Sequence, residues 1–243
     1  MINDYGSDTG KKYAMHNYSG TVYLGLKSVE SLITSHFKNH NIKVCDYGCG
    51  AGGSTRFLKG LDLGGLHLEI EGFDISTAML SQAKEQDPDG AYQLIVNNKV
   101  PAADNTYDLI FCSFVFFELG TTELIHTVLL EMQRILKPDG YVLIITGTTA
   151  IYEPNNKWVS YDANFPENEN LKSGDQAKII LKDVDLVLHD YYWTKENYAA
   201  FFAHANLSIV EERLPVVAPG DPEEDWQDER EKAPFINYLL KSV

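Results

Sequence analysis

The sequence lacks several features that would assign it to a particular class of protein. No apolar run approaches the roughly 20 consecutive residues that a membrane-spanning helix needs. The first residues carry neither the basic stretch nor the apolar stretch of a secretory signal peptide. The three cysteines, Cys45, Cys49 and Cys112, cannot pair evenly into a disulfide framework. These absences favour a protein of the reducing cytoplasm.

Basic residues are also scarce. Lysine and arginine number 20 against 35 aspartates and glutamates, which gives a formal net charge of −15. Nucleic-acid binding needs a basic surface to neutralise phosphates, and no run of Lys or Arg provides one. The charge therefore disfavours a nucleic-acid partner and favours cationic ligands. An acidic protein can still bind RNA through a local patch, so an RNA substrate stays open as an alternative.

No internal repeat and no Pro/Gly/Ser-rich linker divides the chain, which predicts a single domain over residues 1–243. Within it we expect an N-terminal lid and helix over 1–40 and a cofactor-binding core over 41–150. A substrate-side insertion and closing strands are expected over 151–243. The oligomeric state is left open.

Hydrophobic patterning predicts strands that alternate with helices. The expected strands are 43–47, 67–73, 92–96, 107–114 and 141–146, and the expected helices are 21–38, 54–59, 123–136 and one capped at Ser76 or Thr77 that ends near 85. Such alternation predicts an α/β fold with a parallel sheet covered on both faces. Later in the chain, paired strands are expected at 178–182 and 185–193, then a helix at 194–206 and strands at 207–214 and 234–241. The acidic stretch 220–231 is expected to be an exposed connection.

A glycine-rich turn follows the first predicted strand. Gly48, Gly50 and Gly53 satisfy the G-x-G-x-x-G pattern of dinucleotide-binding proteins. Glycines at such a turn let the backbone approach a ligand closely. However, Asp46 lies two residues before the first glycine, where its charge opposes a diphosphate and suits an ammonium group. The chain also lacks the second half of repeated βαβ units, so the dinucleotide reading ranks last.

An acidic residue ends the second predicted strand. Asp74 lies 22 residues after Gly52, close to the spacing of about 20 at which an acid binds ribose hydroxyls in such folds. A carboxylate accepts hydrogen bonds from both hydroxyls at once. Together with the glycine turn, Asp74 predicts a site for a ribose-containing cofactor.

These motifs resemble those of class I S-adenosylmethionine-dependent methyltransferases, of the small-molecule type. The similar segments are Asp46-x-Gly48-Cys49-Gly50-x-Gly52, Phe73-Asp74-Ile75-Ser76, Val100–Ile110 and Leu136–Tyr141, in the order of the family. They cover about residues 43–146. The resemblance implies a Rossmann-like, seven-stranded, mostly parallel sheet with helices on both faces and an antiparallel C-terminal strand.

The resemblance also implies where the cofactor S-adenosylmethionine, and its product S-adenosylhomocysteine, would bind. Glycines of the turn would approach the methionine portion with Asp46 nearby, Asp74 would hold the ribose, and Ile75 would pack on the adenine. The full expected set is Tyr13, Asp46, Gly48, Cys49, Gly50, Gly52, Asp74, Ile75, Met79, Asn97, Asn98, Ser113 and Phe114. Many relatives have an acid after the third strand for the adenine amino group, whereas this chain has Asn97 and Asn98. An amide oxygen can accept the same bond.

The residues that would bind the methyl acceptor carry weaker signals. Methyl transfer mainly needs alignment and exclusion of water, so no strong motif is expected. We expect acceptor contacts from Tyr18, Phe117, Glu118 and Tyr192, and His189 is the candidate general base. No metal is expected, because the cysteines lack the partners of a zinc site.

The predicted activity is transfer of a methyl group from S-adenosylmethionine to an oxygen or nitrogen of a small molecule, aromatic acceptors included. Two alternatives stay open. One is an RNA or protein methyltransferase, and the other is a domain that binds the cofactor without catalysis.

Overall fold

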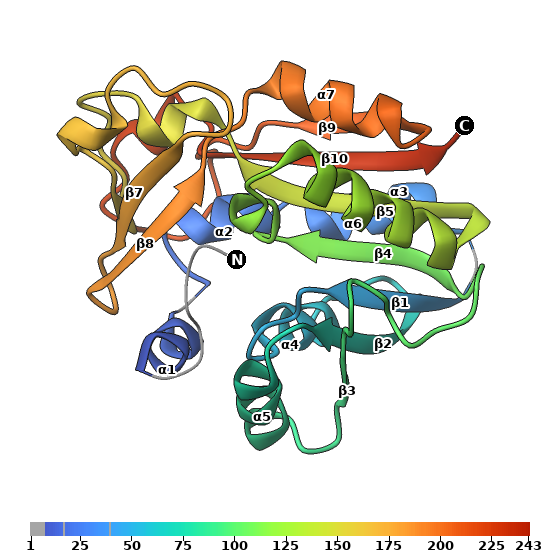
Figure 1. Cartoon of the computed structure of the whole chain (residues 1–243). Coiled ribbons are helices and arrows are strands. Elements are labelled where there is room, and N and C mark those ends of the chain that lie inside the picture. The colour runs from blue at the N-terminus through green and yellow to red at the C-terminus, as the bar shows by residue number, and fades with distance from the viewer. Residues whose placement is uncertain (1–7, 17, 39) are drawn as a thin grey trace.

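A computed structural model describes residues 8–16, 18–38 and 40–243, and its centre is a seven-stranded sheet (Figure 1). The strands are β1 (Asn41–Tyr47), β2 (His67–Asp74), β3 (Ala91–Leu94), β4 (Tyr107–Ser113), β5 (Leu136–Gly147), β9 (Leu207–Arg213) and β10 (Phe235–Ser242). Their order in the sheet is β3-β2-β1-β4-β5-β10-β9. The first five run parallel, and β10 is antiparallel to both β5 and β9. The expected fold class is confirmed.

Helices cover both faces of the sheet, which is why most residues of its central strands β1 and β4 are buried (Figure 1). On one face lie α2 (Thr21–Leu26), α3 (Val29–His36) and α4 (Gly53–Lys59), and on the other α6 (Thr122–Ile135) and α7 (Lys195–His204). The helix α5 (Thr77–Gln86) packs beside β2 and β3. Val44 and Leu109 face the first layer, while Cys45 and Ile110 face the second, as alternation along a strand requires.

Several predicted boundaries are confirmed, with one helix divided. Ser76 caps α5 by accepting a hydrogen bond from the Met79 N–H at 3.3 Å. The helix expected over 21–38 is broken between α2 and α3. The Asn237 side chain, from β10, donates to the Gly25 carbonyl at 2.9 Å. That carbonyl would otherwise serve the next turn of a continuous helix.

A second sheet of three antiparallel strands is inserted between β5 and α7. It contains β6 (Tyr161–Asp162), β7 (Gln176–Leu181) and β8 (Leu186–Tyr191), in that order. The expected pair of strands is confirmed as the β7–β8 hairpin. Along β8 the side chains of Leu186, Leu188 and Asp190 are buried, whereas Val187 and His189 are exposed. The hairpin therefore presents one buried face to the rest of the protein.

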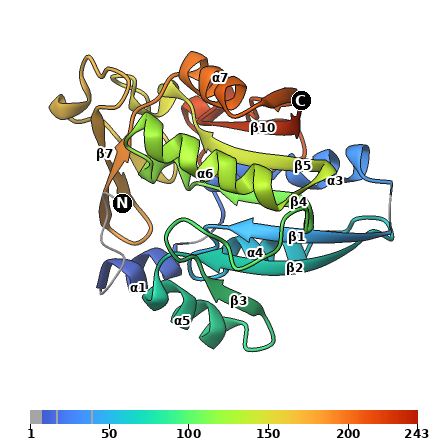
Figure 2. The same cartoon turned by 45° about the vertical axis from the view of Figure 1, so that its right-hand side comes forward.

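An N-terminal helix, α1 (Asp8–Met15), lies against α5 and β8 (Figures 1 and 2). No periodicity predicts it. Contacts with the β7–β8 turn hold it in place: Lys12 Nζ donates to the Asp185 carbonyl at 3.1 Å, and His16 Nδ1 lies 2.8 Å from an Asp183 carboxylate oxygen. The helix and the residues after it thus reach the carboxyl edge of the sheet, where ligands bind in open α/β folds.

The acidic stretch 220–231 is a mostly exposed connection, as its charge predicts, but part of it is buried. Glu229 is fully buried, and one of its carboxylate oxygens accepts hydrogen bonds from Thr21 Oγ1 and the Val159 N–H, both at 2.6 Å. Trp226 is buried as well. The stretch therefore connects α2 to the insertion, and charge alone could not reveal these partners.

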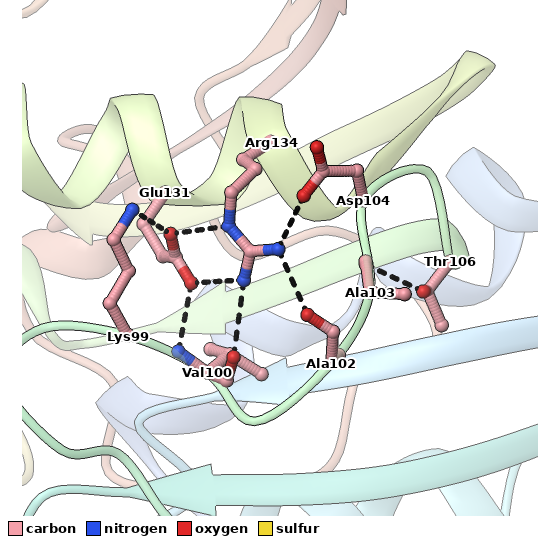
Figure 3. A network of polar contacts seen from close by, with 8 residues as sticks. All are labelled: Lys99, Val100, Ala102, Ala103, Asp104, Thr106, Glu131 and Arg134. Atoms are coloured by element: carbon pink, nitrogen blue, oxygen red, sulfur yellow. Dashed lines mark hydrogen bonds and ion pairs between the residues drawn. The ribbon is translucent and has the colours of Figure 1, made fainter.

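A buried ion network attaches the segment between β3 and β4 to α6 (Figure 3). Glu131 is 1% exposed, and its two oxygens accept from Arg134, Lys99 and the Val100 N–H at 2.7–2.9 Å. Arg134 also donates to the Ala102 carbonyl at 2.9 Å. Burial by itself raises the pKa of Glu131, but the hydrogen bonds from Arg134 and Lys99 outweigh it and lower the pKa. The network holds in place the chain that leads to β4.

No helix within the described ranges is both long and apolar enough to cross a membrane.

Candidate active site

The glycine turn after β1 adopts a conformation that side chains would obstruct. Gly48 and Gly50 have φ values of 76° and 52°. A Cβ atom at Gly48 would lie 2.2 Å from Val115 Cγ2. The N–H groups of Gly48 and Cys49 both donate to the Phe73 carbonyl, at 2.7 and 3.0 Å. The turn is therefore fixed to the end of β2, with its backbone open to a ligand.

Gly52, which was expected beside the ligand, packs closely against Tyr92. Its φ is 79°, and a Cβ atom there would lie 2.6 Å from the Tyr92 hydroxyl. The glycine that lines a cavity at this end of the turn is Gly53. A Cβ atom at Gly53 would lie 2.5 Å from the Tyr18 hydroxyl, so its small size lets Tyr18 approach α4.

Asp74 links the glycine turn to the start of α5. One carboxylate oxygen accepts from the Gly50 N–H at 2.9 Å and the other from the Ser76 N–H at 2.8 Å. Burial raises the pKa of Asp74, while these backbone hydrogen bonds partly offset the rise. Two carboxylate oxygens offer about four acceptor positions, so the side chain retains capacity for the hydroxyls of a ligand.

Asp46 is completely buried behind the glycine turn. Its Oδ2 accepts from Ser54 Oγ at 2.7 Å and from Thr55 Oγ1 at 2.5 Å, whereas its Oδ1 has no hydrogen-bond partner. Burial raises its pKa to about 6 despite these two bonds. An unsatisfied buried carboxylate oxygen is rare in folded proteins and points to a missing polar or cationic group.

A cavity of about 210 Å³ lies beside the turn and has the lining expected for an adenosine. Ile75 is 44% exposed although it is large and apolar, and it forms part of the wall with Met79 and Ile95. Asp74 lies in the same wall. Of the two asparagines after β3, Asn98 lines this cavity and Asn97 does not. The wall thus offers an apolar surface to a flat ring, a carboxylate to a sugar and an amide to a polar ring edge.

A second cavity, of about 450 Å³, covers the glycine turn itself. Of the residues expected to contact cofactor or acceptor, Tyr13, Gly48, Cys49, Gly50, Ser113, Phe114 and Tyr18 line it. Burial, followed by the charges of Glu118, Asp190 and Asp74, raises the pKa of Tyr13. The negative potential around Tyr13 favours a cationic ligand at this position.

Phe114 stands where the cavities meet. It follows β4 with a φ of 62°, a conformation that is strained for a bulky residue. Its N–H donates to the Ile145 carbonyl at 2.9 Å, and its ring stacks at 10° on Phe117 with centroids 6.5 Å apart. Such strain gathers at ligand-binding positions. Phe114 and Tyr13 line both cavities above and a third one.

The third cavity is small, about 50 Å³, and lies between α1, the residues after β4 and the β7–β8 hairpin. Tyr18, Phe117 and Glu118, all expected as acceptor contacts, line it. So does Asp190, which is 6% exposed and accepts from the Tyr152 hydroxyl at 2.6 Å. Burial raises the pKa of Asp190 to about 7, and the hydrogen bond from Tyr152 and the charge of Glu118 act in opposite directions on it.

The placement of His189 argues against its predicted role as general base. It lies on the exposed face of β8, while its neighbour Asp190 faces the cavity. Alternation along the strand separates these two residues, but the sequence does not say which face is buried. Tyr192 also lies outside the three cavity walls, and its ring packs on Tyr152 with centroids 6.0 Å apart. Asp190 is thus the residue that sequence reasoning missed.

No group of three His, Cys, Asp or Glu side chains in the described part of the chain is arranged to hold a metal ion.

Comparison with known proteins agrees with this site. Residues 45–144 match the family model described as a methyltransferase domain. The malonyl-[acyl-carrier protein] O-methyltransferase of Pseudescherichia vulneris is 25% identical over 171 residues, which cover 69% of this chain and 64% of that protein. The demethylmenaquinone methyltransferase of Thermotoga maritima is 32% identical over 115 residues, 47% of this chain and 46% of that protein. The chain thus spans less than two thirds of either relative.

Among solved structures, a SAM-dependent methyltransferase from Aquifex aeolicus superimposes with a TM-score of 0.62 at 18% identity and covers 97% of this chain and 99% of that one. An open sheet with a glycine turn and an acidic residue at the ends of its first two strands defines a domain built to bind an adenosine cofactor. The family match shows a methyltransferase domain over residues 45–144, and the fold is shared with a solved S-adenosylmethionine-dependent methyltransferase, which indicates S-adenosylmethionine as the cofactor.

Proposed function

We propose that this protein transfers a methyl group from S-adenosylmethionine to a nitrogen or oxygen of a small molecule. One observation carries the proposal: Phe114 and Tyr13 join a cavity suited to adenosine with a small, largely apolar cavity. A methyl donor bound in the first cavity and a methyl acceptor bound in the second would meet beside the rings of Phe114 and Tyr13. Juxtaposition of this kind accounts for much of the rate in such displacements.

The residues around the larger cavities fit the cofactor. Asp74 would bind the ribose hydroxyls, Ile75 would pack on the adenine and Asn98 would meet its amino group. The backbone of the glycine turn would follow the methionine portion, whose ammonium group suits the unsatisfied oxygen of Asp46. When bound, the cofactor supplies a methyl group already activated by the sulfonium.

The side chains around the junction would then exclude water, and one of them would accept a proton from the methyl acceptor. Tyr13 of α1, Tyr18, Phe114 and Phe117 line the small cavity and would exclude water from it. Glu118 and Asp190 are the carboxylates in the acceptor cavity. With its pKa near 7, Asp190 is suited to accept a proton from an acceptor that must lose one.

The size of the acceptor cavity supports a small molecule over a macromolecule. A water needs roughly 10–15 Å³ of such volume, so the 50 Å³ cavity holds about three to five groups of that size. The net charge of −15 disfavours RNA in addition. We further propose that the chain acts as one domain, in which the described residues of 1–40 close over the core 41–150 and 151–243 supplies the acceptor side; residues 1–7, 17 and 39 of the expected lid lie outside the described residues.

Calorimetric titration tests the cofactor assignment. Wild type and Asp74→Ala are titrated with S-adenosylmethionine, S-adenosylhomocysteine and NADH. Micromolar binding of both adenosyl ligands, weakened at least tenfold in the variant and absent for NADH, is expected. Absence of adenosyl binding would overturn the proposal. Binding without turnover on a broad acceptor panel would instead favour a non-catalytic domain.

A further inference from the structure

We propose that Tyr152 is a positioning residue for proton transfer: its hydroxyl holds one oxygen of the Asp190 carboxylate and leaves the other for the methyl acceptor. This inference rests on the proposed function, in which Asp190 accepts a proton. It adds to the acceptor half a side chain that no sequence motif marks and that lies outside the cavity wall.

The hydrogen bond between the two side chains is short and buried. The Tyr152 hydroxyl donates to Asp190 Oδ2 at 2.6 Å, and the two residues are 5% and 6% exposed. Hydrogen bonds to an ionised acceptor are shorter and about twice as strong as those between neutral groups. Asp190 lines the small cavity, whereas Tyr152 is not among the residues of its wall. Tyr152 therefore contacts the base without contacting the acceptor.

The backbone that carries Tyr152 is tied to other parts of the molecule. Tyr152 ends a short 3₁₀ helix, η2 (Thr149–Tyr152), that follows β5. Thr148 caps this helix, and its hydroxyl also donates to the Ala233 carbonyl at 2.6 Å. A side chain that is to orient another needs such support, because looseness in the supporting group passes to the reacting one. The hydroxyl is thus presented to Asp190 from a buried, tethered segment.

The titratable groups around Asp190 determine when it can accept a proton. Those that interact with its charge or share its cavity are Glu118, Tyr13, Tyr152, Tyr161, Tyr198 and His16. Burial raises the pKa of Asp190 to about 7, the hydrogen bond from Tyr152 lowers it, and the charge of Glu118 raises it. Burial, followed by the charge of Asp190, raises the pKa of Tyr152 well above its usual value. Tyr152 therefore keeps its proton while Asp190 titrates, and it stabilises the ionised form that acts as a base.

The proton transfer balances without a further reactant. An O–H or N–H group of the acceptor gives its proton to the Asp190 carboxylate, and the electron pair so freed forms the bond to the methyl carbon. The carbon–sulfur bond breaks and leaves its electrons on sulfur. Asp190 then releases the proton to solvent, while Tyr152 keeps its own proton throughout.

Infrared titration tests this role, because a protonated carboxyl group absorbs apart from ionised carboxylates. Wild type, Tyr152→Phe and Tyr192→Phe are titrated from about pH 4 to pH 10, and Asp190→Asn identifies the band of Asp190. Phenylalanine keeps the ring and removes the hydroxyl alone. Tyr192→Phe is the matched control, since the Tyr192 ring packs on Tyr152 with centroids 6.0 Å apart but it is the Tyr152 hydroxyl that donates to Asp190. Cooperative thermal unfolding shows that each variant is folded.

We expect the midpoint of Asp190 protonation to rise by about 1–2 pH units in Tyr152→Phe, because the ionised form loses a charge-assisted hydrogen bond. Tyr192→Phe should titrate as wild type does. In steady-state assays, the pH of half-maximal turnover should rise by the same amount in Tyr152→Phe, which a merely structural role would not cause.

An unchanged midpoint in Tyr152→Phe, or an equal rise in Tyr192→Phe, would overturn the inference. So would the absence of any band that titrates in wild type and is missing in Asp190→Asn. The infrared measurement needs no cofactor, so failure of S-adenosylhomocysteine to bind wild type would overturn the proposed methyl transfer separately.

Discussion

The two halves of the site are built in different ways. The cofactor half is made of short segments that each follow one strand: the glycine turn after β1, Asp74 and Ile75 after β2, and Asn98 after β3. The acceptor half combines α1, the residues after β4 and the β7–β8 hairpin, which are far apart in the chain. The first half has a strong sequence signal because local backbone geometry makes it. The second half has a weak signal because only packing brings its parts together.

The largest effect should come from the turn of the cofactor half. Gly48→Ala adds a Cβ atom 2.2 Å from Val115 in a backbone with φ of 76°. We expect a loss of about 2–4 kcal/mol in the free energy of unfolding and no measurable cofactor binding. Gly64→Ala is the matched control, since its φ is 59° but nothing lies within 4 Å of the added atom.

Chemical denaturation and calorimetry measure both variants. Gly64→Ala should cost about 1–2 kcal/mol and leave cofactor affinity unchanged. Similar cofactor affinity in the two variants would show that the glycine turn tolerates a side chain. The cofactor half would then not depend on local backbone geometry, as the comparison of the two halves requires.

The network in Figure 3 should give the next largest effect, on the stability of the core. Arg134→Ala removes hydrogen bonds to Glu131 and to the Ala102 carbonyl. We expect a loss of about 2–4 kcal/mol, because a buried carboxylate is left with fewer partners. The exposed pair Lys195–Glu212 is the control, and Lys195→Ala should cost less than about 1 kcal/mol in the same denaturant series.

The acceptor half should respond to pH. Because burial raises the pKa of Asp190 from 3.8 to about 7, the folded protein holds a proton that the unfolded chain releases. Stability therefore falls as pH rises from about 4 to 7. Asp190→Asn has no such proton to lose, so it should be more stable than wild type by on the order of 4 kcal/mol above pH 7. The two should be nearly equal at pH 4.

Thermal unfolding of wild type and Asp190→Asn across this pH range checks whether stability falls as pH rises. A stability difference that does not change between pH 4 and pH 8 would contradict the burial of a titrating Asp190. In steady-state assays of wild type, turnover should increase through about pH 7 as Asp190 loses its proton.

The smallest effect should come from the contact that holds α1. Asp183→Asn weakens the pair with His16, which we expect to cost about 0.5–1 kcal/mol. The KM of the acceptor should rise a few-fold with little change in cofactor affinity, because α1 borders the acceptor cavity. Asp185→Asn is the control, since the contact of Asp185 with Lys12 uses its backbone carbonyl and its φ is 47°, which Asn tolerates. Equal KM values in the two variants would contradict this role of α1.

Much of the fold and of the cofactor half could be predicted from the sequence. Alternating strand and helix patterns predicted the parallel sheet. The N-cap of α5 was predicted at Ser76 or Thr77, and it is Ser76. The choice between Asn97 and Asn98 could not be made, because both have positive φ and only the cavity distinguishes them. The packing of Gly52 against Tyr92 could not be predicted from the glycine motif either, because Tyr92 lies in β3, outside the motif.

The acceptor half was predicted only in part. Tyr18 was expected as part of an N-terminal lid, and Phe117 and Glu118 were expected because they follow the fourth predicted strand; all three line the small cavity. His189 was the candidate base and Asp190 was not a candidate, because alternation gives two faces of the strand without saying which one is buried.

The sequence by itself determined the alternation of strands and helices, the glycine turn and the acidic residue that ends the next strand, because each of these depends on a pattern of residues within one short segment of the chain. Only the tertiary structure decided what faces the acceptor. The burial of Asp190, and with it the rise in its pKa, requires α1 and the β7–β8 hairpin to close against the end of β4. Desolvation depends on every segment that surrounds a group, and no single segment of the sequence contains that information.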